Sequence, residues 1–136
     1  MKGWATRACA GLLAAWLGVS WAPGALAAGQ GPAGRALTGA ELFEACAGCH
    51  ALAPGAPHRN GPNLWGIAGQ RAATREGFAY SEALSSSGFT WNRGTLTAWI
   101  LATDVVLPGT WMVYHNTLGP DEVGRLVNHI LGAAAD

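Results

Sequence analysis

Apolar residues recur at helical spacing in three stretches of the chain, and each stretch begins with a residue suited to starting a helix. We predict the first helix from Thr38 or Gly39, the second from Thr90 or Asn92, and the third from Pro120. The apolar faces of these helices consist, in order, of Leu42, Phe43 and Cys46; of Leu96, Trp99, Ile100 and Thr103; and of Val123, Leu126, Val127, Ile130 and Leu131.

The segments between these helices show no such period. Residues 51–77 are rich in glycine and proline, and we predict an irregular loop that wraps on another part of the molecule. Residues 80–86 predict a short helix that ends at Gly88, and the apolar residues 105–107 are followed by Pro108-Gly109. The pattern therefore predicts an all-α domain of three main helices joined by long loops.

The first 27 residues have the layout of a secretory signal peptide. Lys2 and Arg7 precede an apolar stretch at 8–21, and Ala25-Leu26-Ala27 forms an A-x-A cleavage site. We therefore assign 1–27 to the signal peptide, 28–37 to a flexible lead-in and 38–136 to the folded domain. The organisation predicts a periplasmic protein with no membrane span after cleavage, and retention of the segment as an anchor is the alternative.

Removal of the signal peptide changes the composition in two ways. Cys9 is lost, so Cys46 and Cys49 are the only cysteines of the exported chain. The exported chain then contains six arginines, no lysine and eight acidic residues, which gives a net charge of about −2. This balance provides no basic surface for nucleic acid or for an acidic membrane. About 109 residues remain, and a large apolar cofactor would add to the modest core of such a chain.

The two remaining cysteines lie in Cys46-Ala47-Gly48-Cys49-His50, a C-x-x-C-H motif that indicates covalent attachment of one c-type haem. In this interpretation the thiols form thioethers to the porphyrin vinyl groups, and the His50 imidazole is an axial iron ligand. Two other interpretations stay open. A redox dithiol would need a βαβ setting, and structural zinc would need a second ligand pair, which the other histidines do not supply.

Four further blocks appear in the order and spacing typical of one family. They are Asn60-Gly61-Pro62-Asn63-Leu64-Trp65-Gly66, Gly77-Phe78-Ala79-Tyr80-Ser81, Gly88-Phe89-Thr90-Trp91 and Pro108-Gly109-Thr110-Trp111-Met112. With the haem motif they make the chain, from Gly39 to about Leu131, resemble class I cytochrome c. The resemblance implies the small cytochrome c fold around one haem c, and redox partner proteins that dock at the exposed haem edge.

Family roles map onto individual residues of this sequence. The resemblance implies that Met112 is the second axial ligand and that a His/Met pair raises the reduction potential. It also implies that the Pro62 carbonyl accepts a hydrogen bond from the outer nitrogen of His50. Tyr80 and Trp91 resemble the family's hydrogen-bond donors to a haem propionate.

The chain departs from the family at several positions. Gln70 stands where the family has a propionate-binding arginine, with Arg71 one place beyond, and Trp111 stands where a lysine commonly precedes the methionine. Trp99 replaces a tyrosine whose hydroxyl approaches the methionine sulfur, so that hydrogen bond is either absent or made by the indole. Docking is therefore expected to be apolar and centred on Trp111.

One departure concerns the crossing of the first and last helices. Gly39 and Phe43 match the residues with which the family packs the first helix on the last, but His129 replaces the expected aromatic. We interpret His129 as a partly exposed packing residue and expect a looser crossing.

These observations predict a soluble, monomeric, periplasmic one-electron carrier without enzymatic activity. Two alternatives remain: a five-coordinate haem enzyme or gas sensor, in which Met112 is off the iron, and a dedicated haem subunit of a dehydrogenase.

Overall fold

The computed structural model describes residues 34–134, which fold into an all-α domain as predicted. The helices are α1 (Gly39–Ala47), α2 (Glu82–Ser86), α3 (Arg93–Leu101), α4 (Thr103–Val106) and α5 (Pro120–Gly132). An isolated antiparallel β-bridge joins Arg71 to Thr90. The predicted signal peptide, Cys9 and the first part of the lead-in lie outside the described residues.

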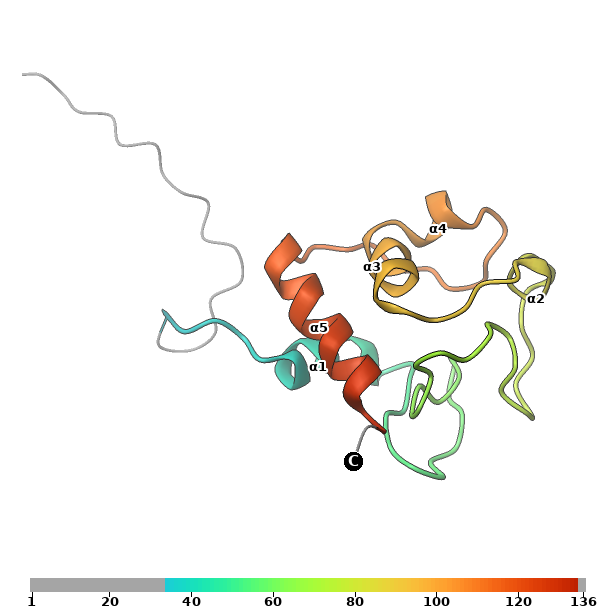
Figure 1. Ribbon diagram of the computed structural model, residues 1–136, viewed down its shortest axis with the longest axis horizontal. Coiled ribbons are helices and arrows are strands. Elements are labelled where there is room, and N and C mark those ends of the chain that lie inside the picture. Colours follow the sequence, from blue (N-terminus) through green and yellow to red (C-terminus); the bar gives the residue numbers. More distant parts are fainter. Residues whose placement is uncertain (1–33, 135–136) are drawn as a thin grey trace, which may run out of the picture.

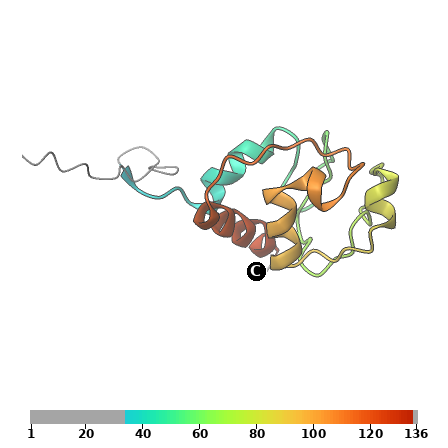
Figure 2. The ribbon, with the colours of Figure 1, turned by 90° about the horizontal axis from the view of Figure 1, so that it is seen from above.

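Helices α1 and α5 cross at one end of the molecule (Figures 1 and 2). Their backbones approach closely at Gly39, where a Cβ atom would lie 2.5 Å from both the Arg125 carbonyl oxygen and His129 Cβ. The Phe43 and His129 rings pack at a centroid distance of 5.9 Å, and His129 is half-buried. His129 is thus the partly exposed packing residue that we predicted, and the expected looseness is not seen in this close crossing.

Helix α3 packs against α5 and completes the core. Leu42, Leu96, Val123, Leu126 and Val127 are among its most deeply buried side chains. Because three short amphipathic helices supply this core, it occupies one half of the molecule, and loops form the other half (Figure 1).

The start of α3 is fixed by Asn92, whose side chain accepts a hydrogen bond from the Thr95 backbone N–H, so Thr90 is not the cap. We placed Thr103 on the same helix, and this was wrong. Helix α3 ends at Leu101, Ala102 is extended at φ −159°, and Thr103 begins α4. The Thr103 hydroxyl donates to the Trp99 carbonyl at 2.8 Å, so Thr103 is buried beside α3 without belonging to it.

The long loop between α1 and α2 is held together by His58 and Asn63. The His58 ring accepts from the Asn63 backbone N–H and donates to the Glu76 carbonyl, each at 2.9 Å. The Asn63 side-chain amide donates to the Ala53 and Ala56 carbonyls. These bonds join distant parts of a segment without helix, so the loop has a defined path.

No helix among residues 34–134 combines the length and hydrophobicity that a membrane crossing requires.

Candidate functional site

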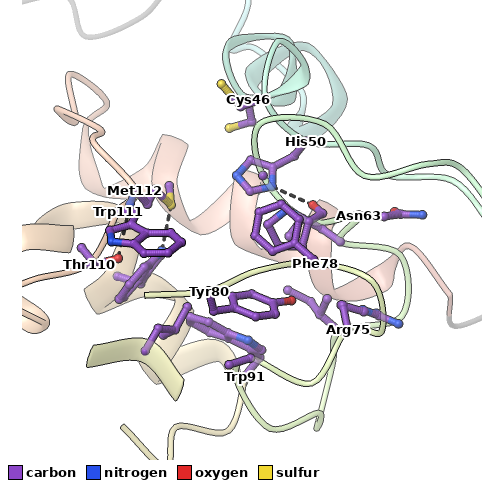
Figure 3. A pocket seen from close by; sticks show the side chains of 18 of the residues that line it. Cys46, His50, Asn63, Arg75, Phe78, Tyr80, Trp91, Thr110, Trp111 and Met112 are labelled. Atoms are coloured by element: carbon purple, nitrogen blue, oxygen red, sulfur yellow. Dashed lines mark hydrogen bonds between the residues drawn. The ribbon is translucent and has the colours of Figure 1, made fainter. Parts of the chain in front are cut away.

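A cavity of about 480 Å³ lies between the helices and the long loop. Both cysteines, His50, Met112, Tyr80 and Trp91 line it, so every site residue that we predicted from the sequence faces one space. Figure 3 shows His50 and Met112 approaching it from different segments, with Tyr80 and Trp91 farther along its wall. This volume lies within the range of roughly 300–1,000 Å³ typical of small-molecule and cofactor sites.

The two thiols reach the cavity from the end of α1. The backbone N–H groups of Cys49 and His50 both donate to the Cys46 carbonyl, at 3.0 and 2.9 Å, and the chain turns sharply there. This turn brings the imidazole to the cavity in the residues that directly follow the helix. Cys46 is half-buried and Cys49 is exposed. Burial, and next the neighbouring Cys49, raise the pKa of the Cys46 thiol.

The His50 ring is oriented by the loop opposite. Its Nδ1–H donates to the Pro62 carbonyl oxygen at 2.8 Å, which leaves the Nε2 lone pair for a ligand. A side chain at Gly61 would overlap the ring, so the backbone passes against its face there. Burial lowers the pKa of His50, and the hydrogen bond to Pro62 opposes this effect. Burial thus favours the neutral ring, the form that binds a metal.

Met112 follows the Pro108-Gly109 turn, and its sulfur meets the indole of Trp99. The Trp99 Nε1–H donates to Met112 Sδ at 3.1 Å (dashed in Figure 3). Trp99 is 4% exposed and packs edge-on against Trp91 at a centroid distance of 5.5 Å. Of the two possibilities that the sequence left open for Trp99, the structure shows the indole hydrogen bond.

Arg75 lies beside Tyr80 and was not among the residues that we predicted. Its half-buried guanidinium lines the cavity and donates to the Trp65 carbonyl oxygen. The cavity lining includes no carboxylate, and the only ion pair among residues 34–134 joins Arg35 to Glu41. Burial raises the pKa of Tyr80, whereas Arg75 lowers it. Arg71 also lines the cavity but is exposed. In the sequence, Arg75 lies shortly before the block that begins at Gly77, but no motif assigns it a role.

The donor set and the wall chemistry fit a haem. The wall is mainly apolar, two thiols stand beside an imidazole, and a thioether comes from a separate segment. The Tyr80 hydroxyl, the Trp91 indole and the arginines provide donors for carboxylate groups. Among the described residues, no three His, Cys, Asp or Glu side chains are grouped to hold a metal ion, so the zinc interpretation finds no ligand set.

Known proteins resemble this chain in sequence and in fold. No protein-family model matches it. Cytochrome c2 of Blastochloris viridis is 36% identical over 113 residues, which cover 82% of this chain and 89% of that protein. Cytochrome c of Chlamydomonas reinhardtii is 36% identical over 107 residues, covering 78% and 96%. The solved structure of cytochrome cH from Methylobacterium extorquens superposes with a TM-score of 0.63 at 31% identity, over 68% of this chain and 92% of that one.

Proposed function

Because the chain belongs to the class I cytochrome c family, we propose that it is a soluble periplasmic carrier whose haem iron is ligated by His50 and Met112. As a member of this family, the chain is an electron-transfer protein with covalently bound haem c, and it is not an enzyme. Haem c supplies the reversible Fe(III)/Fe(II) couple, which exchanges one electron with a partner protein.

The observation that carries this proposal is the pair of oriented ligand atoms on one cavity. His50 is held by the Pro62 carbonyl at 2.8 Å and Met112 by the Trp99 indole at 3.1 Å, and all four residues line the cavity. Such bonds keep a ligand in place while the charge of the iron changes, so little reorganisation accompanies transfer. With both positions taken by protein side chains, no site remains for a substrate.

In this proposal Cys46 and Cys49 form the two thioether links, while Tyr80 and Trp91 hold the propionates. The half-buried Arg75 guanidinium adds a positive charge at the Tyr80 end, where a propionate carboxylate would balance it. These roles rest on family resemblance and on the common cavity.

Replacement of Met112 tests the ligand assignment. We expect Met112→Ala to remove the weak long-wavelength absorption band of a methionine-ligated ferric haem, to produce a high-spin spectrum and to lower the reduction potential. His115→Ala is the matched control, because His115 is the nearby alternative ligand in sequence and should leave the spectrum unchanged. An unaltered spectrum in Met112→Ala would refute the assignment.

The location is tested separately. The signal-like sequence at 1–27 supports export, so the full-length chain expressed in a Gram-negative host should accumulate in the periplasm with Ala28 as its first residue. Mass spectrometry of the purified protein measures this. A chain that keeps its first 27 residues in the membrane fraction would instead indicate an anchored carrier.

A further inference from the structure

Side chains from Trp111 to His115 alternate between exposed and half-buried positions. Trp111 is 68% exposed and Val113 is 84% exposed, whereas Met112 between them turns its sulfur to Trp99. An extended chain directs successive side chains to opposite sides. The segment that presents the Met112 sulfur to the cavity therefore also presents a tryptophan and a valine to solvent at its mouth.

The segment that bears these two residues carries no charged side chain of its own. No Asp, Glu, Lys or Arg occurs between Asp104 and Asp121, nor between Glu44 and His58 in the segment that contains Cys46 and Cys49. The only ionised side chains of the cavity wall are Arg71 and Arg75. In Figure 3, Arg75 and Trp111 are well separated, with Tyr80 between them in the view. The segment that presents Trp111 at the cavity mouth is therefore uncharged.

A neutral surface with an exposed tryptophan attracts a particular kind of partner. Charged partners gain little there, because no fixed charge steers or holds them. Burial of a tryptophan removes a large apolar area from water, and tryptophan is enriched among the residues that dominate binding energy. Association through such a surface depends weakly on ionic strength.

We propose that Trp111 and Val113, here called the Trp111 face, dock the uncharged apolar surface of a redox partner protein. This inference rests on the proposed carrier function and specifies the chemistry of its partner. The reduced protein gives one electron to the oxidised partner while the two apolar surfaces are in contact, and no bond or proton is exchanged.

Electron self-exchange provides a defined test, because a second copy of the chain presents the same neutral surface as the probe. The rate constant is measured by NMR in mixtures of the reduced and oxidised wild-type protein. Between about 20 mM and about 500 mM NaCl we expect it to change by less than about twofold. A large change with salt would overturn the proposal, since it would show that charged groups govern the encounter.

Three variants locate the contact. Trp111→Ala should slow self-exchange about tenfold at every salt concentration. Trp111→Lys should also slow it and make it accelerate with salt, because two like charges then meet and salt screens them. Val105→Lys is the matched control: Val105 is 75% exposed but does not line the cavity, so its exchange rate should stay at the wild-type value.

Absorption spectra and reduction potentials of all variants separate the two proposals. If wild-type protein shows no reversible one-electron couple, the carrier function fails before docking is measured. If every spectrum and potential is retained and Trp111→Ala exchanges at the wild-type rate, docking at the Trp111 face is refuted and the carrier function stands. A slower Val105→Lys would likewise refute the location.

Discussion

If Met112 ligates the iron as proposed, the hydrogen bond from Trp99 to Met112 couples packing to redox chemistry at a single residue. The Trp99 indole is buried against Trp91 and Phe89, which fixes its direction toward the Met112 sulfur. A donor to the sulfur withdraws electron density from the ligand. As an iron ligand, the sulfur would then stabilise Fe(III) less, so the bond would favour the reduced state and raise the potential.

Trp99→Phe removes this donor while keeping an aromatic ring. We expect a lower reduction potential, by the equivalent of roughly 1 kcal/mol, the typical net value of one hydrogen bond. Potentiometric titration measures the change, and Trp99→Tyr serves as control because its hydroxyl can donate to the same sulfur. A potential in Trp99→Phe equal to or above that of Trp99→Tyr would contradict this explanation.

Arg75→Gln tests the charge at the opposite end of the cavity. In the proposed arrangement, removal of this half-buried cation would leave a propionate carboxylate less compensated, so we expect a lower reduction potential. Arg71→Gln is the control, since Arg71 is exposed and screened by water, and its effect should be smaller. Potentials measured at one ionic strength decide the comparison, and a larger effect at Arg71 would assign the propionate contact there instead.

The predictability of site residues depended on whether a motif fixed their position. Cys46, Cys49 and His50 lie in one C-x-x-C-H motif, and the resemblance of the block ending at Met112 to the family's loop implied the fourth residue. The position of Arg75 depends on the path of a glycine-rich loop. That loop shows no periodic pattern in the sequence from which its path could be predicted. The Trp99 hydrogen bond depends on the tilt of an indole in the core, and only packing determines it.

Among the elements, the crossing of α1 and α5 depends most on a small side chain. Gly39→Ala places a methyl group 2.5 Å from the Arg125 carbonyl oxygen and forces the helices apart. We expect a loss of about 1–3 kcal/mol in the free energy of unfolding, as for other overpacked sites. Denaturant titration measures it. Gly124→Ala is the matched control on α5: its Cβ meets nothing within 4 Å, so helix propensity should stabilise the protein slightly.

The first turn of α1 carries the clearest pH dependence. Hydrogen bonds from Arg35, then from the Thr38 backbone and hydroxyl, lower the pKa of Glu41 from 4.5 to about 2. The stabilisation is therefore complete above pH 4.5 and disappears as the pH falls toward 2. We expect Glu41→Gln to be less stable than wild type at pH 7 and nearly equal to it near pH 2. Urea midpoints measure this, with the exposed Glu44→Gln as control.

Helix starts were easier to predict than helix ends. Thr38, Asn92 and Pro120 are cap or first-turn residues whose chemistry is local, and α1, α3 and α5 begin beside them. The apolar spacing that linked Thr103 to α3 was misleading. Thr103 begins α4, and it is buried there with its hydroxyl hydrogen-bonded to the Trp99 carbonyl. The spacing of apolar residues indicates which residues are buried, but it does not indicate where the backbone bends.

At the scale of the whole molecule, the helical core accounts for only part of the interior. The other part is the cavity, around which the long loop and the segment after α4 are wrapped. A cofactor that fills this cavity covers its mainly apolar wall, and burial of apolar surface stabilises a protein in proportion to the area removed from water. The cofactor is thus structurally part of the core.

Loss of both attachment points should therefore prevent folding of the loop half and destabilise the rest. We expect exported Cys46→Ala/Cys49→Ala protein to lack haem, to show much weaker helical circular dichroism and to melt without a cooperative transition, because no other group fills the cavity. Cys49→Ala alone keeps one thiol and should retain haem and a cooperative, lowered melting temperature. A haem-free double variant with native helical signal and a sharp transition would show that helices α1, α3 and α5 suffice for the fold without the cofactor.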